Sequence, residues 1–467
     1  MSAGRGRSAA VLAAVLAAAP AAVTPQADVQ VKRYDTGEVY EGQFREGRQE
    51  GVGSLSRPDG FRYDGEFREG RIEGRGIAHY ADGSVYEGDF IAGRPHGEGE
   101  IRFADGSTYA GEWVDGRIEG RGRAAYPDGS VYEGDFRDAR PEGEGVLTRP
   151  DGYRYEGAFR DRLPHGTGTA VYPDGSVYAG EMVEGRREGQ GRLTLPDGFE
   201  YEGGWRAGAY HGQGRAVQAN GDLYEGAFED GVRHGEGTAR FADGSVYVGG
   251  FAADLRHGRG RFEAPDGFRY EGDWVEGRIE GQGRAVHPDG SVHEGAFAAG
   301  RPHGPGRVEW VDGGSYEGDW VEGEIEGEGA AVYPDGTRYV GGFRAGRYHG
   351  EGELTYPDGY SYRGGWAEGL QDGEGRTEFP DGTVYEGGFR AGLRHGRGRL
   401  EMPDGFVYEG DWSEGEIEGE GVARYGTGDL YEGAFRAGRR HGSGRMVYAD
   451  GAVFEGQWTE GRPGGTE

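Results

Sequence analysis

Hydrophobic and polar residues alternate in short segments along the chain, and glycine-rich sequence separates the segments. In the segment SVYEGDF at 84–90, Tyr86, Gly88 and Phe90 share one parity, and the two acidic residues share the other. A second alternating segment, GEIRF, follows at 99–103. A period of two residues is typical of β-strands, whose successive side chains point to opposite faces. The pattern therefore predicts pairs of short strands.

A tight turn joins the two strands of each pair. Asp105-Gly106 supplies it here, and many other copies have Pro-Asp-Gly, as at 127–129. Proline presets the φ angle of a type I turn, and glycine adopts the left-handed conformation that follows. Each pair of strands is therefore predicted to form a β-hairpin. Because an isolated hairpin is only marginally stable in water, neighbouring hairpins are expected to stack.

The hairpin pattern repeats every 23 residues without an insertion. Steps of 23 residues from Tyr40 reach 19 starts, of which 17 are Tyr and the others are His293 and Phe454. We number the repeat positions 1 to 23 from these starts. Position 3 is Gly in all 19 copies, and position 5 is Phe or Trp except at Met182. Because a missing residue would turn every later side chain of a strand to the wrong face, the unbroken spacing indicates that the repeats stack physically.

The composition limits how such hairpins can pack. Hydrophobic residues make up 34% of the chain, and 101 of its 467 residues are glycines without a side chain to bury, so a thick core is excluded. Aromatic residues reach 12%, which is unlike the composition of a disordered chain. A turn at 35–37 lies one unit before the first complete copy, so the array is expected to begin near Val29. The predicted fold is all-β, an elongated single-layer array of about 19 stacked β-hairpins.

A longer period is superimposed on the C-terminal half. From Phe251 on, Phe and Trp alternate at position 5, and from His257 on, His and an acidic residue alternate at position 11. The unit of this half is therefore a pair of hairpins, as in the near-identical segments at 270–283 and 316–329. Two explanations stay open: size matching, in which Trp interleaves with Phe on neighbouring hairpins, and a record of duplication alone.

The consensus Y-E-G-x-F/W-x-x-G-x-x-H-G-x-G-x-x-x-Y-P-D-G-x-x resembles the MORN (membrane occupation and recognition nexus) repeat. The resemblance covers residues 29–467. It implies a curved array of hairpins with a groove lined by the Tyr and Phe/Trp positions, and a scaffold function in which the groove receives a helix or extended segment of a partner. The chain differs from many relatives because it has no attached enzyme domain and because half of its copies replace the His with Glu or Asp.

The predicted partner groove lies where the aromatic positions are densest, between Tyr270 and Trp412. An alternative is that these rings are engaged in stacking from hairpin to hairpin, with little surface left for a partner. The predicted groove residues are Tyr270, Trp274, Tyr316, Trp320, Tyr339, Phe343, Tyr362, Trp366, Tyr385, Phe389, Tyr408 and Trp412.

The N-terminal segment differs from the array. Two arginines, at 5 and 7, precede an apolar run at 9–23, which is too short to span a membrane. A basic start, an apolar middle and small residues predict a secretory signal peptide at 1–27, cleaved near 21–27. The array then occupies 28–467, with a half unit before Tyr40 and a truncated unit at 454–467. Lys32 is the only lysine against 51 arginines, which indicates GC-rich codons, a bacterial source, and a periplasmic or secreted location.

The charge excludes some classes of partner. The net charge is −31, and the acidic residues are spread along the repeats. Nucleic acid is not expected as a partner because binding to phosphates needs a basic face. Anionic lipid is disfavoured for the same reason.

The sequence offers no focused chemistry. Nine histidines occupy position 11, but hairpins about 10 Å apart cannot easily share a metal ion, so we expect rings that hydrogen-bond the backbone at a turn. The Asp-Gly turns lack the nonapeptide spacing of calcium-binding β-rolls. The chain contains no G-x-S-x-G, H-E-x-x-H or P-loop motif and no cysteine. We therefore predict no catalytic residue, no metal site and no cofactor, and hence no enzyme.

Three functions fit these observations. The first is an exported, non-catalytic scaffold that binds a protein segment, either a helix or an extended peptide. The second is a module that binds the cell wall or a glycan, because aromatic faces stack on sugars and repeated shallow sites bind multivalently. The third is a passive structural spacer. Open sheet edges also leave end-to-end self-association open.

Overall fold

A computed structural model of the chain describes residues 28–464. The secondary-structure elements in this range are all β-strands, from β1 (Gln30–Arg33) to β39 (Arg462–Pro463). The prediction of an all-β array of about 19 hairpins is therefore confirmed. The predicted signal peptide lies outside the described residues.

Each repeat contributes one strand of seven residues, at positions 23 to 6, and one of nine, at positions 9 to 17. The seven-residue strands are β2 (Val39–Arg45), β4 (Arg62–Arg68), β6 (Val85–Ile91), β8 (Thr108–Val114), β10 (Val131–Arg137), β12 (Arg154–Arg160), β14 (Val177–Val183), β16 (Glu200–Arg206), β18 (Leu223–Glu229), β20 (Val246–Ala252), β22 (Arg269–Val275), β24 (Val292–Ala298), β26 (Ser315–Val321), β28 (Arg338–Arg344), β30 (Ser361–Ala367), β32 (Val384–Arg390), β34 (Val407–Ser413), β36 (Leu430–Arg436) and β38 (Val453–Thr459). The nine-residue strands are β3 (Arg48–Ser56), β5 (Arg71–His79), β7 (Arg94–Arg102), β9 (Arg117–Ala125), β11 (Arg140–Thr148), β13 (Leu163–Val171), β15 (Arg186–Thr194), β17 (Ala209–Val217), β19 (Val232–Arg240), β21 (Leu255–Glu263), β23 (Arg278–Val286), β25 (Arg301–Glu309), β27 (Glu324–Val332), β29 (Arg347–Thr355), β31 (Leu370–Glu378), β33 (Leu393–Glu401), β35 (Glu416–Arg424) and β37 (Arg439–Val447).

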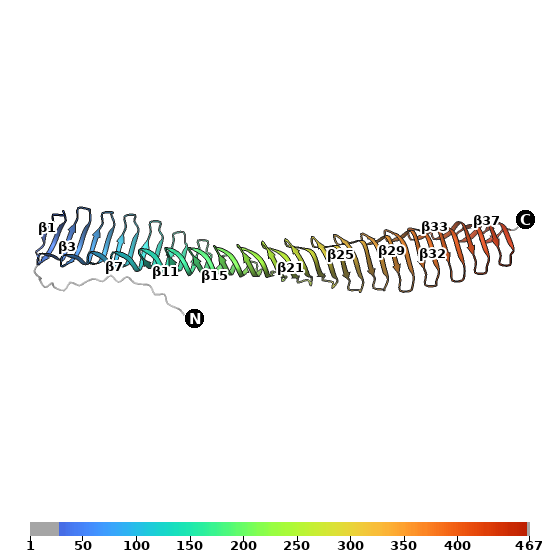
Figure 1. Cartoon of the computed structure of the whole chain (residues 1–467), viewed down its shortest axis with the longest axis horizontal. Coiled ribbons are helices and arrows are strands. Elements are labelled where there is room, and N and C mark those ends of the chain that lie inside the picture. The colour runs from blue at the N-terminus through green and yellow to red at the C-terminus, as the bar shows by residue number, and fades with distance from the viewer. Residues whose placement is uncertain (1–27, 465–467) are drawn as a thin grey trace, which may run out of the picture. The chain divides into compact units, whose positions relative to one another are not determined.

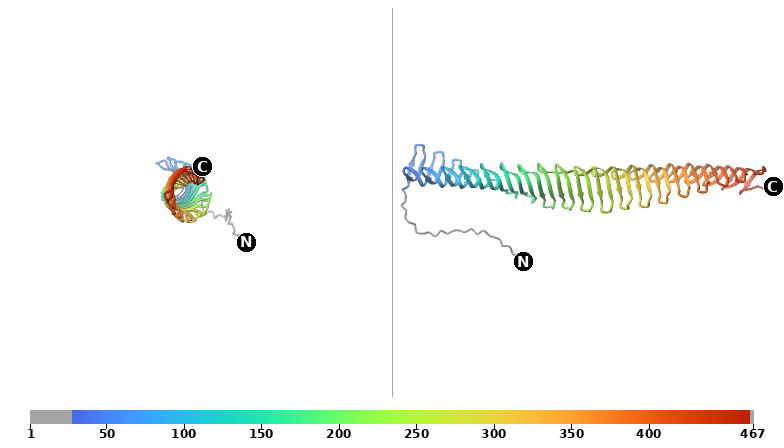
Figure 2. Two further views of the ribbon diagram at one scale, coloured as in Figure 1. Left: turned by 90° about the vertical axis from the view of Figure 1, so that its right-hand side faces the viewer. Right: turned by 60° about the horizontal axis from the view of Figure 1, so that its bottom comes forward.

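The chain divides into two compact units, whose described parts are residues 28–187 and 188–464. Within each unit, strands that follow one another in sequence pair antiparallel, as β6 does with β7 and β22 with β23. Figure 1 shows the hairpins of each unit following one another in a single layer. The hairpins of each unit turn gradually from one to the next, as expected from the natural twist of strands (Figure 2).

The turn at positions 18 to 21 has the predicted structure. The amide of Gly106 donates to the carbonyl of Phe103 at 3.0 Å, and Gly106 has a φ of 87°. The carboxylate of Asp105 accepts hydrogen bonds from the hydroxyl of Ser107 at 2.6 Å and from its amide at 2.8 Å, and these two bonds hold the pKa of Asp105 below its ordinary value. The Asp of the turn therefore has a local structural function.

The sequence did not predict the second turn of each repeat, at positions 7 and 8. Residues 94–98 belong to β7, which therefore begins five residues earlier than the predicted segment at 99–103. Ala92 and Gly93 form a two-residue turn with φ angles of 51° and 79°, both of which are left-handed. This conformation strains Ala92, because non-glycine residues seldom adopt it.

Position 11 of the preceding repeat supports this strained turn. The amide of Ala92 donates to Glu73 Oε2 at 3.0 Å, and the amide of Asp115 donates to His96 Nδ1 at 3.4 Å. A His at position 11 can therefore accept the same bond as an acidic residue, although Nδ1 of His211 and Nδ1 of His349 have no hydrogen-bond partner among the described residues. The prediction that the histidine rings hydrogen-bond the backbone is confirmed for His96, although the residue itself lies in β7 rather than in a turn.

The two faces of the sheet differ in chemistry. In β6 and β7, Tyr86 lies opposite Ile101, Gly88 opposite Gly99, and Phe90 opposite Pro95. Positions 1, 3, 5, 10, 14 and 16 thus share one face, here called the aromatic face. Positions 2, 4, 13, 15 and 17 share the other, here called the polar face.

The position-1 tyrosine lies flat over two glycines. A Cβ atom added to Gly99 would lie 2.2 Å from Tyr86 Oη, and one added to Gly88 would lie 2.5 Å from it. Only glycine therefore fits under the ring. The hydroxyl of Tyr86 donates to the carbonyl of Asp89 at 3.0 Å, so the phenol can be buried without losing its hydrogen bond.

The tyrosines join the position-5 rings into a ladder. Phe90 meets Tyr86 edge-on at 5.1 Å and Tyr63 of the preceding repeat at 5.0 Å, and Trp113 meets Tyr86 at 5.0 Å. A tyrosine ring lies between successive position-5 rings, so Phe and Trp of neighbouring hairpins do not interleave directly. The explanation of their alternation by direct interleaving is therefore wrong. Each Trp at position 5 instead donates its indole N–H to a Gly carbonyl of the preceding repeat, as Trp113 does to Gly99 at 3.2 Å.

His293 is the one start position occupied by neither Tyr nor Phe. Its ring takes the tyrosine's place, 5.1 Å from Phe297 and 5.0 Å from Trp320, and is 2% exposed. The imidazole does not reach the carbonyl of Ala296 as a phenol would, and Nε2 has no hydrogen-bond partner among the described residues. Burial lowers the pKa of His293 to about 4.

Replacing this histidine should stabilise the second unit. His293→Tyr supplies the missing hydroxyl and should raise the free energy of unfolding by about 1 kcal/mol. In the native chain the pKa of about 4 lies below the ordinary value of 6.5, so stability should be full above pH 6.5 and fall as the pH drops towards 4. His293→Tyr should remove that part of the pH dependence.

Urea unfolding between pH 4 and 7 measures both effects. His257→Tyr, a matched change at an exposed histidine of the second unit, should leave the acid-side loss of stability unchanged. An identical pH profile for the native chain and His293→Tyr would show that the buried imidazole does not control it.

Candidate functional site

The twelve predicted groove residues are part of the ring ladder rather than of an open surface. All of them are buried: Tyr316 is 0%, Trp320 7% and Phe389 8% exposed. Burial raises the pKa of Tyr270 to about 12, so its phenol stays a neutral hydrogen-bond donor. The structure thus favours the alternative in which the rings stack from hairpin to hairpin. Partner binding by these twelve residues stays a prediction.

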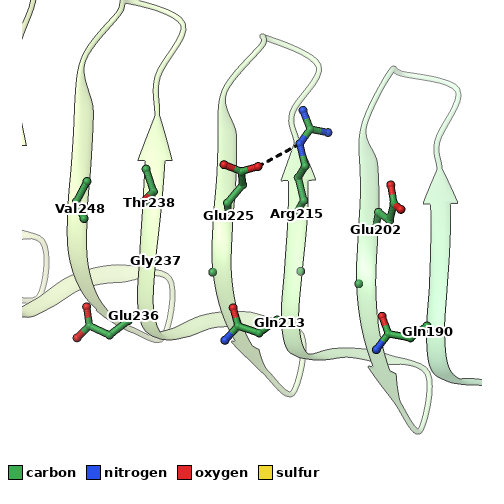
Figure 3. A pocket seen from close by; sticks show the side chains of 12 residues that line it. Gln190, Glu202, Gln213, Arg215, Glu225, Glu236, Gly237, Thr238 and Val248 are labelled. Atoms are coloured by element: carbon green, nitrogen blue, oxygen red, sulfur yellow. Dashed lines mark ion pairs between the residues drawn. The ribbon is translucent and has the colours of Figure 1, made fainter.

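The polar face carries a groove instead. In the second unit its floor is the main chain of Gly203, Gly214, Gly226 and Gly237, at positions 3 and 14. Positions 2 and 15 form one wall, and position 13 forms the other (Figure 3). We call this the glycine-floored groove. The wall residues in Figure 3 are Glu202, Arg215, Glu225, Thr238 and Val248 on one side, and Gln190, Gln213 and Glu236 on the other.

The glycine floor is open because the neighbouring side chains on the polar face are short. The side chains of neighbouring positions on the polar face are short here: position 4 is Gly204 in β16, Ala227 in β18 and Gly250 in β20. Position 4 therefore adds little to the wall that position 13 builds. The floor residues are glycines because the tyrosine rings cover them from the opposite face, as Tyr201 covers Gly214.

Charges of opposite sign alternate along one wall. Arg215 at position 15 lies beside Glu225 at position 2 of the next repeat, with 3.5 Å between Nε and Oε1 (Figure 3). Arg284 and Glu294 form the same pair at 2.9 Å. About half of each side chain in these pairs is exposed, and an exposed pair stabilises the fold by less than about 1 kcal/mol. The charges are therefore accessible to a ligand.

The groove extends beyond the residues in Figure 3. Residues 236–295 continue it over the floor glycines 249, 260, 272, 283 and 295. The first unit contains a groove of the same build, with Arg121 and Glu144 on one wall, Glu133 on the other, and Gly122 and Gly134 in the floor. The same geometry thus recurs in both units.

The groove offers binding groups rather than reactive ones. Its polar side chains are carboxylates, guanidinium groups, amides and the hydroxyl of Thr238, without a Ser, Cys or His beside a base. Within residues 28–464, no group of three or more His, Asp or Glu could hold a metal ion. In the same range, no helix is long and apolar enough to cross a membrane.

Comparison with known protein families identifies the family of the chain. The family model described as MORN repeat matches 19 consecutive segments, from residues 40–62 to residues 454–466. The chain therefore belongs to the MORN repeat family, as its resemblance to that repeat predicted. A comparison with curated proteins found no match.

Comparison with solved structures found matches of low identity and low TM-score. The TCP10 domain of Danio rerio CPAP in complex with a STIL peptide is 15% identical, covering 58% of this chain and 98% of that chain, with a TM-score of 0.16. The SAS-4 TCP domain of Drosophila melanogaster with a proline-rich motif of Ana2 is 12% identical, covering 46% and 97%, with a TM-score of 0.19. An inactive virginiamycin B lyase from Staphylococcus aureus is 10% identical, covering 66% and 93%, with a TM-score of 0.11. Similarities at these TM-scores carry no functional argument.

Sequence reasoning missed the glycine-floored groove. The signal was present in the opposite charges at positions 15 and 2, as in Arg215 and Glu225, and in the small residues at position 4. Attention to the aromatic positions directed the prediction to the opposite face of the sheet.

Proposed function

We propose that the chain is a non-catalytic scaffold that holds an extended segment of a partner protein along the glycine-floored groove. The observation that carries the proposal is the recurrence of one geometry in successive repeats: a bare main-chain floor between a wall of alternating charge and a wall of amides, carboxylates and the guanidinium of Arg259. Belonging to the MORN repeat family is consistent with a scaffold.

The walls suit a polypeptide ligand. Gln190 and Gln213 can donate to and accept from a peptide backbone, while Arg215 and Glu225 can pair with charged side chains of either sign. Each contact is shallow and exposed to water, so affinity should come from many repeats engaged at once. Such binding should weaken with added salt, because exposed charges are screened.

A glycan is a weaker candidate for this groove. The carboxylates and amides could bond to sugar hydroxyls, but sugar rings also stack on exposed aromatic faces. The rings that could serve this purpose, such as Tyr224 and Phe228, lie on the opposite face and are 4% and 6% exposed.

Site-specific crosslinking tests the groove. A photoreactive amino acid replaces Gln213 in the wall or, as a control, Asp266 in an exposed turn, and the labelled chain is irradiated in extract of the source cells. We expect a protease-sensitive adduct from position 213 only. Arg215→Glu combined with Arg261→Glu should weaken it about tenfold by reversing two wall charges, whereas Arg278→Glu, outside the groove, should not.

Three results would contradict the proposal. Equal adducts at both positions would show non-specific contact, and an adduct removed by glycan hydrolases but not by proteases would favour the glycan module. The absence of any adduct at position 213 would favour a passive spacer.

We further propose that residues 1–27 direct export from a bacterial cytoplasm. The basic start, the apolar run at 9–23 and the small residues after it support this assignment. The N-terminal sequence of the protein recovered from the periplasm or medium should begin between residues 21 and 28. Recovery of a chain that retains its first residues from the cytoplasm alone would contradict it.

A further inference from the structure

A second row of rings follows the turns at positions 18 to 22, at the margin of the aromatic face. Of the 19 turns between Tyr34 and Ala452, 18 carry an aromatic or imidazole ring at position 18 or 22. The exception is the turn between Gln218 and Asp222, which carries a ring at neither position. The row is therefore interrupted once, in the second unit.

The neighbours of this gap show what is missing. Six turns carry a ring at position 22, and in five of them that ring meets the position-18 ring of the next turn, with centroids 5.4 to 5.8 Å apart. The sixth is Phe199, whose next turn supplies Gln218 instead. Phe199 contacts Tyr210 at 6.2 Å. The five complete pairs are Phe61–Tyr80, Tyr153–Tyr172, Phe268–His287, Tyr360–Phe379 and Phe406–Tyr425.

A hollow occupies the place of the missing ring. Phe199, Tyr210 and Phe241 line it with aromatic surface, and Gln218 and Asp222 lie at its rim. We call it the Phe199 hollow. It lies on the face opposite the glycine-floored groove and is distinct from it.

The hollow is lined by two acidic and two basic side chains, Asp222 and Asp254 against Arg233 and Arg240. The guanidinium of Arg233 donates through Nε to Asp254 Oδ1 at 3.1 Å and through Nη2 to the Asp254 carbonyl at 2.7 Å, so its charge is paired. Asp222 forms no ion pair with a cationic side chain of the described residues. Its carboxylate accepts from the amide of Ala242 at 2.7 Å and from Asn220 Nδ2 at 3.0 Å, both of them neutral donors.

The chain itself does not supply the missing ring from outside the described residues. Residues 1–27 and 465–467 contain no Phe, Tyr, Trp or His. These two segments therefore offer no ring to the hollow.

We propose that the Phe199 hollow takes one aromatic side chain of a partner polypeptide. The five complete pairs show that a ring at this place packs against the position-22 ring, and such edge-on or tilted ring contacts stabilise beyond the burial of area.

Peptide binding to the full chain tests the proposal. The probe is a fluorescently labelled peptide, acetyl-Gly-Arg-Tyr-Arg-Gly-amide, with a version that carries Ala for Tyr. We expect the Tyr peptide to bind at one site and the Ala peptide to bind about tenfold or more weakly. Equal affinity for the Ala peptide, or no binding of the Tyr peptide at millimolar concentration, would overturn the proposal.

Two variants separate binding from folding. Gln218→Tyr fills the hollow with a ring of this chain, so it should abolish peptide binding while the melting temperature is kept or raised. Tyr425→Gln opens the same gap beside Phe406, where Asp429 already accepts from the amide of Ala449 at 2.9 Å as Asp222 does from Ala242. It should add a second binding site of similar affinity.

The outcomes also distinguish this site from the groove. Arg215→Glu should leave peptide binding unchanged, because Arg215 lies on the polar face. Unchanged binding in Gln218→Tyr would overturn the assignment to the hollow. Preferential binding of a soluble chitin or glucan oligosaccharide that Gln218→Tyr abolishes would assign the hollow to glycans and overturn the proposal for a polypeptide.

Discussion

The packing of one tyrosine ring over two glycines is the contact on which each repeat depends. A sheet of one layer has no second layer to cover its apolar side chains, so each repeat must supply its own cover. Tyr86 does so by lying across Gly88 and Gly99 and touching a ring on either side. Its hydroxyl bonds to the main chain three residues on, which permits burial of a polar group.

The other features of the repeat follow from this contact. Glycine is required at positions 3 and 14 because any Cβ there would strike the phenol. The rings are buried in this packing, so the exposed surface of the sheet lies on the polar face and at the turns. The strained turn at positions 7 and 8 is supported by position 11 of the preceding repeat, which explains why Glu73 and His96 are interchangeable there. Where this bond forms, position 11 links one hairpin to the next.

The sequence predicted the hairpins and the two faces because both depend on local order. Parity assigns Tyr86, Gly88 and Phe90 to one face, and Asp105-Gly106 identifies the turn between the strands. Parity does not show what covers a face, so it could not show that Trp320 is buried by its neighbours. The bond from Ala92 to Glu73 joins residues 19 apart and needs the strand register, which the sequence alone does not give. The gap at Gln218 could have been found by aligning the turns, but its meaning depends on the five ring contacts seen elsewhere.

Titration of the tyrosines tests the central claim most directly. Burial raises the pKa of position-1 phenols such as Tyr201, Tyr247 and Tyr362 to about 12 or beyond, from an ordinary value of 10.0. If these rings form the core, fewer than half of the 29 tyrosines should ionise by about pH 11 while the β-sheet circular dichroism is intact, and the rest should ionise only as the sheet unfolds. Ionisation of all 29 in one step near pH 10 with the sheet intact would show exposed rings and contradict the account.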